Sequence, residues 1–380
     1  MATITLKPAL KGSTLTVEAK AGGSDLASIF YEFEGDFHPS DAGIANAALV
    51  GFMPYAMSKG MDIFVEGAVD SDLLEALEEG QDAWSLWHPG KFRQVSISAE
   101  ETRAQKLPET RSAVIAFSGG LDASYALHAH KRGLIGRRSL DVKAATLAHG
   151  FDLPLDREDW FLEARKKAAA IAASYDVPLV TVRTNWRSLR APWEQSFIFA
   201  ISSIIHQYKG IFGHGVIAAD EAYDGEILGW GSNSITNQLM SGPSFPLHFT
   251  GAGKWRTEKA RSLGLEKVIL ENLRVCWERP DSLGNCGECE KCLRTKLNFQ
   301  AVGLVNVPAL GRPATAKQIR EIKVNSDAVM NLFMELSRYP WRDQPEIKAA
   351  LTALVANGPQ RLSWISRNWK KAKRKVIARI

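Results

Sequence analysis

Apolar and polar positions alternate along this chain with two periods, one typical of strands and one of helices. Over the first 105 residues the pattern predicts strands at residues 4–19, 29–34, 62–69 and 92–97, and helices at residues 41–58 and 72–84. This is the element order of a small α+β unit, and no motif in it suggests a chemical reaction. The polar residues 100–110, which include Pro108, are expected to form a linker.

A regular alternation of strands and helices begins at residue 113. It predicts strands at residues 113–117, 142–148, 179–182 and 211–217, and helices at 122–131, after Asp156, and at 193–207. Asp156 can cap the second helix, whose apolar stripe is Phe161, Ala164, Ala168 and Ile171. The sequence therefore predicts an α/β fold with a doubly wound parallel sheet, in which ligands bind at the carboxyl ends of the strands.

We expect a small α+β domain at residues 1–105, an α/β catalytic domain at 106–310 and a helical region at 311–380. Apolar residues are 45% and charged residues 23%, which is ordinary for a globular protein, and we expect it in the cytoplasm. The N-terminus has no basic region followed by an apolar run, so no signal peptide is expected. The longest uncharged stretch, residues 42–58, is interrupted by Asn, Gly and Pro and predicts a buried helix, not a transmembrane segment.

The net charge of +5 is concentrated at the C-terminus. Residues 361–380 contain eight Lys or Arg residues and no acidic residue, which leaves a net charge of −3 for the first 360 residues. Apolar residues of this tail form one helical stripe opposite the basic ones. Such a helix packs on the protein itself, or docks on an acidic surface, RNA or an anionic membrane. Binding to nucleic acid is thus expected through the tail alone.

The clearest chemical motif joins the first strand of the regular alternation to its first helix. It reads Ser118-Gly119-Gly120-Leu121-Asp122-Ala123-Ser124. Two glycines let the backbone approach an anion, and the N–H groups at the start of the helix point at it. Ser118 and Ser124 can donate hydrogen bonds, and Asp122 would hold an Mg²⁺ ion that bridges phosphates. The alternative is a tight turn between strand and helix that binds nothing.

This motif is neither a Walker A loop nor the glycine-rich loop of dinucleotide-binding folds. It resembles the Ser-Gly-Gly-x-Asp-Ser signature of the PP-loop ATP pyrophosphatase superfamily, with Ala123 in the last position. The resemblance implies an adenine nucleotide α-hydrolase-like fold and an enzyme that cleaves ATP between the α and β phosphates to adenylate an acceptor oxygen. It also implies an adenine site where Phe151 stacks on the base and His149 meets a phosphate. The alternative is a packed phenylalanine and a surface histidine.

All four cysteines of the chain lie close together in sequence, in the pattern Cys276-x9-Cys286-x2-Cys289-x2-Cys292. Clustered cysteines in an otherwise cysteine-free chain indicate a metal site in a reducing compartment. Four thiolates fill the tetrahedral shell of Zn²⁺ and leave no position for water, so a structural zinc site is expected. An iron–sulfur cluster is the alternative, because thiolates also hold such clusters.

The phosphate loop and the run Cys286-Gly-x-Cys289-x-x-Cys292-x-Arg294 together resemble the 7-cyano-7-deazaguanine synthase (QueC) family, over about residues 110–305. The resemblance implies ATP, Mg²⁺ and structural zinc, and a small carboxylate substrate of the 7-carboxy-7-deazaguanine type that reacts with ammonia. Divergent relatives occur in bacterial anti-phage operons, which implies an alternative antiviral role in which a partner protein supplies the amine. The family's substrate segment is not matched, and the region that replaces it offers His214, Asp220, Glu221 and Asp224.

Adenylation passes through a highly charged transition state, at which cations must be aimed. Lys254, Arg256 and Lys259 follow two glycines at the start of an expected helix and are the candidates for this role. The acidic Asp220, Glu221 and Asp224 follow the strand at 211–217, where they could bind metal or accept a proton from ammonia. The alternatives are a solvated charged helix start and a simple acidic loop.

Three functional classes follow from these features. The preferred one is an ATP-dependent carbon–nitrogen ligase that adenylates a carboxylate and lets ammonia or an amine displace AMP. The second is a PP-loop enzyme that transfers sulfur to nucleic acid, for which an iron–sulfur cluster and the basic tail would be the signs. The third is a non-catalytic nucleotide-binding module whose outer regions hold a partner protein. Metal content separates the first two classes, and release of pyrophosphate separates both from the third.

Overall fold

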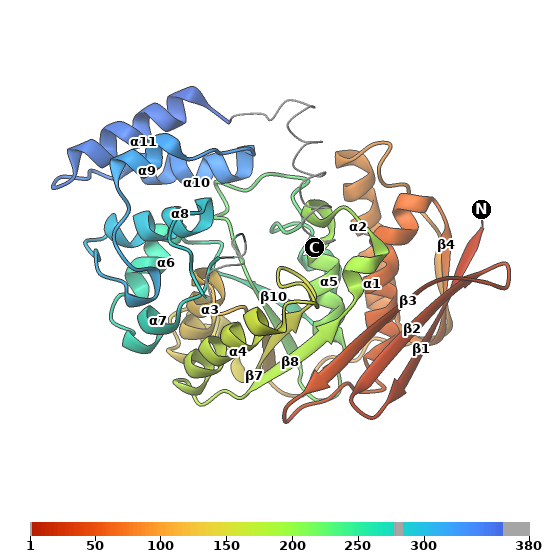
Figure 1. Ribbon diagram of the computed structural model, residues 1–380. Helices are drawn as coiled ribbons and strands as arrows, with labels where there is room; N and C mark the ends of the chain where they lie inside the picture. The colour runs from red at the N-terminus through yellow and green to blue at the C-terminus, as the bar shows by residue number, and fades with distance from the viewer. Residues whose placement is uncertain (1, 277, 279–283, 360–380) are drawn as a thin grey trace.

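The computed structural model describes residues 2–276, 278 and 284–359, so the basic tail at 361–380 lies outside the described residues. Ten strands form one sheet: β1 (Thr3–Lys11), β2 (Thr14–Ala21), β3 (Ser24–Glu34), β4 (Asp62–Asp70), β5 (Ile97–Arg103), β6 (Ser112–Ala116), β7 (Asp141–His149), β8 (Leu179–Thr184), β9 (His214–Ala218) and β10 (Leu247–Thr250). Their spatial order is β10-β9-β6-β7-β8-β3-β2-β1-β4-β5 (Figure 1). Six of the nine neighbouring pairs are parallel, which confirms the predicted α/β fold with a mostly parallel sheet.

The strands from β6 to β10 form one continuous parallel half of the sheet, in the order β8-β7-β6-β9-β10. The chain steps outward from β6 to β8, and then returns past β6 to build β9 and β10. The direction of winding therefore reverses between β6 and β9. In open α/β sheets, ligands bind in the crevice at such a reversal, outside the carboxyl ends of the strands.

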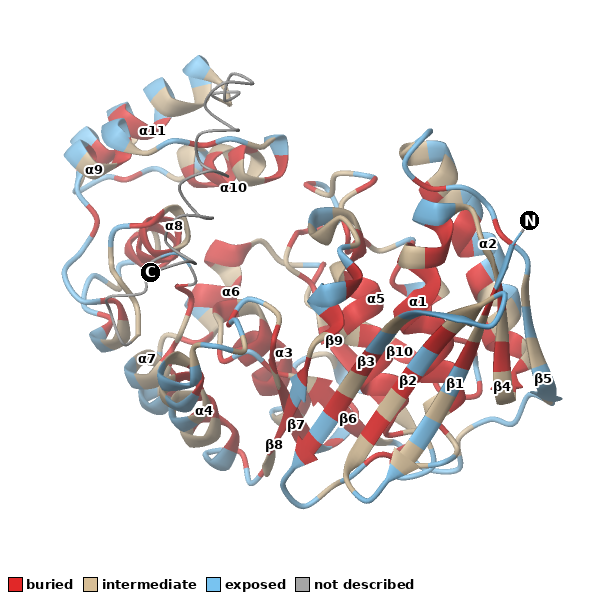
Figure 2. Cartoon of the chain, turned by 45° about the vertical axis from the view of Figure 1, so that its right-hand side comes forward, coloured by how far each residue is buried: buried red, intermediate tan, exposed pale blue. Residues whose placement is uncertain are grey.

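Helices cover both faces of the sheet (Figure 1). One face carries α1 (Ile44–Lys59), α2 (Ser71–Trp87) and α5 (Trp193–His206), and the other carries α3 (Leu121–Lys131), α4 (Glu158–Ala173), α6 (Arg256–Ser262) and α7 (Lys267–Asn272). Val114 of β6 belongs to the core beneath α1 and α5, whereas Ala113 and Ile115 belong to the core beneath α3 and α4. Figure 2 shows buried residues, in red, along α1, α3 and α5. Successive residues of a strand point to opposite faces, so burial of both faces requires the unbroken apolar run seen in the sequence.

The first 105 residues belong to the same sheet as the parallel half. Strand β3 runs antiparallel to β8, with Phe33 opposite Val182. Helix α1 packs against α5 in one shared apolar core. The boundary that the sequence suggests near residue 105 is therefore a boundary along the chain, and the sheet and the core continue across it.

Two expectations about strands in this region are wrong. Residues 4–19 form the hairpin of β1 and β2 instead of one strand, and Gly12 in the turn adopts a φ of 60°. The strand expected at 92–97 lies at Ile97–Arg103, and it overlaps the start of the segment expected to be a linker. This strand, β5, is the edge of the sheet, where charged side chains reach solvent, so it lacks the apolar pattern that marks a central strand.

The chain beyond the cysteines is helical, with α8 (Glu290–Gln300), α9 (Ala316–Glu321), α10 (Asp327–Arg338) and α11 (Pro345–Asn357). A separate apolar core joins the last three helices to Leu293 and Leu297 of α8.

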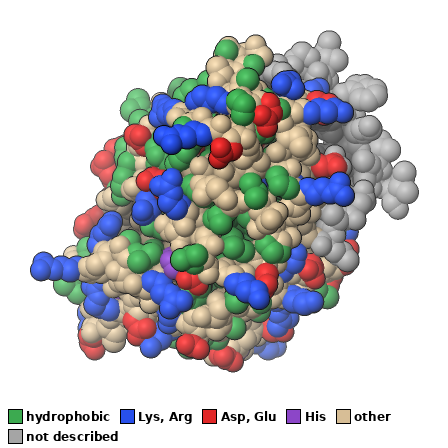
Figure 3. Space-filling view, turned by 90° about the vertical axis from the view of Figure 1, so that its left-hand side faces the viewer, with side chains coloured by type: hydrophobic (Ala, Val, Ile, Leu, Met, Phe, Trp, Pro, Cys, Tyr) green, Lys and Arg blue, Asp and Glu red, His purple; other side chains and the backbone are tan. Residues whose placement is uncertain are grey.

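On the face that Figure 3 shows, Lys and Arg side chains are interspersed with Asp and Glu. No helix in the described ranges is long and apolar enough to cross a membrane.

Short 3-10 turns complete the described secondary structure, at Gly136–Arg138, Trp186–Leu189, Gln238–Met240 and Pro308–Leu310. The cap expected at Asp156 is wrong, because α4 begins at Glu158 and Arg157 takes the N-cap position, without a side-chain cap hydrogen bond. The apolar stripe predicted for α4 is confirmed, because all four of its residues are buried: Phe161, Ala164, Ala168 and Ile171.

Candidate functional site

The loop between β6 and α3 lies where the winding of the sheet reverses. Gly119 adopts a φ of 70°, a conformation that favours glycine, and the Gly120 N–H donates to Ser118 Oγ at 3.3 Å. Ser118 is exposed and Gly120 is half-buried, whereas Ser124 is fully buried. The Ser124 hydroxyl has no hydrogen-bond partner among the described residues. Ser118 and the backbone at Gly120 are thus the parts of the loop that solvent reaches.

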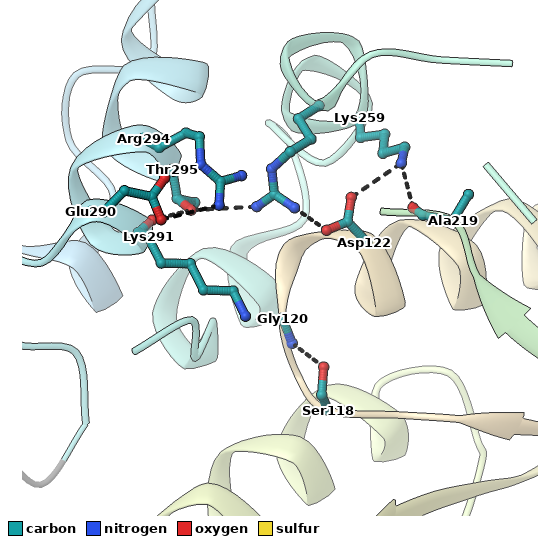
Figure 4. Close-up of polar contacts among 10 residues, drawn as sticks. Ser118, Gly120, Asp122, Ala219, Lys259, Glu290, Lys291, Arg294 and Thr295 are labelled. Carbon is teal, nitrogen blue, oxygen red and sulfur yellow. Dashed lines mark hydrogen bonds and ion pairs between the residues drawn. The ribbon is translucent and has the colours of Figure 1, made fainter. Parts of the chain in front are cut away.

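Asp122, in the first turn of α3, is paired with two cations of α6 (Figure 4). Arg256 donates to Asp122 Oδ2, and Lys259 Nζ lies 3.1 Å from Asp122 Oδ1. Both cations are buried, with 4% and 0% of their side chains exposed. The sequence separates them from Asp122 by 134 and 137 positions, so the fold brings together three of the residues that we expected in the site.

Lys259 also joins the two strands that flank the reversal. Its ammonium donates to the carbonyl oxygen of Ala219 at 2.6 Å, directly after β9 (Figure 4). Burial acts to raise the pKa of Asp122, but the charges of Arg256 and Lys259 outweigh it, so the pKa lies below its ordinary value. The carboxylate is therefore ionised at neutral pH and holds both cations at the crevice between β6 and β9.

Helix α8 supplies a second layer of polar groups behind Arg256. Arg256 donates to Thr295 Oγ1 at 3.4 Å, and Arg294 pairs with Glu290 at 2.5 Å. The side chain of Lys291 also extends from α8 toward the phosphate loop (Figure 4). The sequence alone does not mark these residues of α8 as part of the nucleotide site. They follow Cys289 and Cys292 closely, and that pattern indicates a metal site instead.

Asp220 and Glu221 directly follow β9, and the pKa of each carboxyl group is raised above its ordinary value. Burial, and then the charge of Asp122, raises the pKa of Asp220, and its Oδ1 has no hydrogen-bond partner among the described residues. Burial, and then the charge of Asp220, raises the pKa of Glu221 to about 8. Glu221 also accepts a hydrogen bond from the Ile227 N–H at 3.1 Å. Asp224 is exposed and accepts a hydrogen bond from Trp255 Nε1 at 3.3 Å.

His149 and Phe151 lie at the carboxyl end of β7, next to the crevice. His149 is buried, stacks on Phe161 with ring centroids 4.2 Å apart, and bonds through Nε2 to the Pro154 carbonyl. Phe151 is half-buried and packs against the rings of Trp186 and Trp193. His149 is thus held by the protein itself, and Phe151 retains an exposed part of its ring.

Two expected site residues are not brought to this group. His214 begins β9, so it lies at the amino ends of the strands, on the opposite edge of the sheet from the phosphate loop, and bonds to His248 at 3.0 Å. Lys254 precedes α6 and is half-buried, and in the described part of the chain its side chain forms no hydrogen bond or ion pair. Strand direction separates His214 from Asp122, whereas Lys254 lies two residues before Arg256 and forms no ion pair with Asp122 in the described part of the chain.

The four cysteines converge at the start of α8. Their sulfur atoms all lie within 4.8 Å of one another, with Cys276 Sγ 3.8 Å from Cys289 Sγ and Cys286 Sγ 3.9 Å from Cys292 Sγ. Bonds of about 2.3 Å to one tetrahedral ion set sulfur–sulfur distances of about 3.8 Å. The donor set can therefore bind a metal such as zinc, as the spacing predicts.

The cysteine segment also contacts the phosphate loop. The Arg274 N–H donates to the Gly119 carbonyl at 2.9 Å, and the Arg274 guanidinium donates to the Cys276 carbonyl at 2.9 Å. Burial lowers the pKa of Arg274, although nearby Asp152 acts to raise it. One residue thus links the Gly-Gly turn to the first metal ligand. No motif in the sequence indicates this role.

Comparison with known proteins does not identify this chain. No protein family, no curated protein and no solved structure matches it. Its function must therefore be argued from its own residues.

Proposed function

We propose that this protein is an ATP-dependent carbon–nitrogen ligase that releases AMP and pyrophosphate. The observation that supports it most is the pairing of Asp122, beside the Ser-Gly-Gly loop, with Arg256 and Lys259 at the reversal point of the sheet. Backbone N–H groups at a helix start, with cations fixed opposite them, form a site suited to a polyphosphate. The resemblance of the loop to the PP-loop signature specifies cleavage between the α and β phosphates.

In this proposal Ser118 and the N–H groups at the start of α3 bind phosphate oxygens. Arg256 and Lys259 stabilise the charge that develops on the α-phosphate, and Phe151 offers a ring face to the adenine base. Asp122 orients the two cations. Each of its oxygens is engaged by one cation, and a carboxylate oxygen keeps a further lone pair on which Mg²⁺ could bind. Asp220, whose Oδ1 has no partner among the described residues, is a second carboxylate that could bind the metal.

The acceptor in this proposal is a carboxylate. Its oxygen attacks the α-phosphorus of ATP, the bond to the pyrophosphate breaks, and an acyl adenylate forms. Ammonia or an amine then attacks the acyl carbon, and AMP leaves with the former carboxylate oxygen. Glu221 can take the proton from the amine, because its raised pKa matches that of a base working near neutral pH. A 7-carboxy-7-deazaguanine-type compound is the first acceptor to test, and a partner protein is the alternative source of the amine.

We further propose that the metal on the four cysteines is zinc and that its role is structural. The sulfur–sulfur distances fit one tetrahedral ion, and four thiolates leave no position for substrate. An iron–sulfur cluster binds its cysteines through different irons, which would hold the sulfurs farther apart. The chain has no cysteine outside this group that could carry a persulfide, which favours the ligase over sulfur transfer.

The experiment follows a labelled oxygen. The full chain is incubated with ATP, Mg²⁺, ammonium and an acceptor whose two carboxylate oxygens are both ¹⁸O. The products are separated and identified by mass spectrometry. We expect equal amounts of AMP and pyrophosphate, with one ¹⁸O atom in the AMP. ADP and unlabelled phosphate as products would contradict adenylation. ATP binding without any turnover, across small carboxylates and partner proteins alike, would favour the non-catalytic module.

A further inference from the structure

Glu335 of α10 is a buried carboxyl group close to the cations of α6. Only 3% of the residue is exposed. Its Oε2 accepts a hydrogen bond from Thr257 Oγ1 at 2.9 Å, and Thr257 accepts one from Asn298 Nδ2 at 2.9 Å. Glu335 Oε1 and Asn298 Oδ1 are buried and have no hydrogen-bond partner in the described ranges. Three helices, α6, α8 and α10, thus meet in a polar cluster inside the protein.

This cluster adjoins the site at Asp122. Thr257 follows Arg256 in the first turn of α6, so a bond that fixes Thr257 also fixes the backbone from which Arg256 extends. Arg256 is buried, pairs with Asp122, and has an Nε atom without a partner among the described residues. Any negative charge on Glu335 therefore acts on Arg256 inside the protein, where electrostatic interactions are weakly screened.

We propose that Glu335 is a positioning residue for the nucleotide site, and that its charge controls how strongly Arg256 acts on an anionic ligand. The inference rests on the proposed function. It makes the C-terminal helices part of the site, since Glu335 reaches α6 from α10. A structural role alone would require the hydrogen bond to Thr257 and would not depend on the charge of the carboxyl group.

The charge of Glu335 changes near neutral pH. Burial raises its pKa to about 7, although hydrogen bonds from Thr257 and Tyr339 and the charge of Arg256 act to lower it. The other ionisable group that faces it is Glu258 on α6, which raises the pKa, while α8 contributes Asn298, which does not titrate. Below pH 7 the group is neutral and Arg256 attracts phosphate fully. Above pH 7 the carboxylate competes for Arg256, so nucleotide binding should weaken.

The test measures binding of α,β-methylene-ATP with Mg²⁺ by calorimetry at pH 6 and pH 8. Other groups also titrate in this range. The quantity compared between variants, in the same buffers, is therefore the dissociation constant at pH 8 divided by that at pH 6. Removal of one weakly screened charge near Arg256 should reduce the wild-type ratio by about fivefold in Glu335→Gln. Glu346→Gln, an exposed residue of α11, is the matched control and should keep the wild-type ratio.

A second variant covers the case in which Glu335→Gln does not fold. Thr257→Val removes the hydrogen bond and should weaken binding at pH 6. A wild-type ratio in Glu335→Gln, or wild-type binding at pH 6 in Thr257→Val, would overturn the positioning role while leaving the proposed function intact. Wild-type protein that binds no nucleotide at either pH would overturn the proposed function, and this inference with it.

Discussion

At the scale of single residues, Asp122 acts through its two cations. The sequence suggests a magnesium ligand, because a carboxylate beside a phosphate loop would otherwise repel phosphate. The structure adds Arg256 and Lys259, which engage both carboxylate oxygens. A single negative charge between two buried positive charges leaves the group positive overall, which suits a polyphosphate better than a lone carboxylate would.

Replacing Asp122 by Asn should lower kcat/KM for ATP on the order of a hundredfold, because a neutral amide cannot hold two cations in place. The measurement is the rate of pyrophosphate release. Asp343→Asn, an exposed carboxylate between α10 and α11, is the matched control and should stay within about twofold of wild type. A mild effect of Asp122→Asn would show that the cations are held without it.

Glu221 should make stability depend on pH. Burial and Asp220 raise its pKa from an ordinary 4.5 to about 8 in the folded protein. The folded state therefore binds a proton that the unfolded state has lost, and this contribution to stability is full below pH 4.5 and disappears as pH rises through about 8. Thermal melting at pH 6 and pH 9 should show a loss in the wild type and a smaller loss in Glu221→Gln. Equal losses would contradict the raised pKa.

At the scale of elements, α8 carries both possible metal ligands and polar groups of the proposed nucleotide site. Cys289 is its N-cap and Cys292 lies in its first turn, while Arg294 and Thr295 follow one turn later. Because helical residues three and four positions apart share a face, the ligands and the polar groups near Arg256 have a fixed relation to each other. Metal binding at one end of α8 therefore sets the position of Thr295 against Arg256.

Replacing Cys289 by Ser should remove the metal and lower stability before it changes any chemical step. Loss of a ligand at a structural zinc site acts on folding, and about 3 kcal/mol would lower Tm by roughly 4 °C in a chain of 380 residues. Elemental analysis should find one zinc per wild-type chain and much less in the variant. Glu288→Gln, which lies between two ligands, is the control and should keep the metal. Several iron atoms per wild-type chain, with a matching amount of sulfide, would show that the site holds an iron–sulfur cluster and not zinc.

At the scale of the whole molecule, the ten-stranded sheet makes the N-terminal part a structural partner of the parallel half. The pairing of β3 with β8 covers what would otherwise be an open edge of the parallel strands. Helices α1 and α5 bury their apolar faces against each other, so neither half has a complete core alone. An open edge and an exposed apolar face both favour aggregation.

Residues 106–380 expressed alone should therefore fail to fold. The expected result is an aggregated or poorly helical product by circular dichroism, whereas the full chain unfolds in one cooperative transition. Supplying residues 1–105 in trans is the control and should restore part of the folded signal. A stable fragment with its own sharp thermal transition would mean that the parallel half folds as an independent unit.

The sequence by itself determined the local features. The unbroken apolar runs specify strands buried on both faces, the Ser-Gly-Gly turn between strand and helix predicts an anion-binding loop, and the spacing of four cysteines predicts a group that could bind a metal. Each of these depends on contacts between residues close in the chain, so the pattern of the chain contains the information. The edge strand β5 was displaced from its predicted position because solvent, and not a core, surrounds its charged side chains.

Only the tertiary structure decided which residues share the site. Arg256 and Lys259 reach Asp122 across more than 130 positions because β6 and β9 are neighbours in the sheet, an arrangement that periodicity does not encode. His214 lies on the opposite edge because it begins its strand, while Asp220 and Glu221 follow the carboxyl end of the same strand. Glu335 enters the polar cluster from a helix that carries no motif. Strand order and direction fix these distances, and they follow from how the whole chain buries its apolar surface.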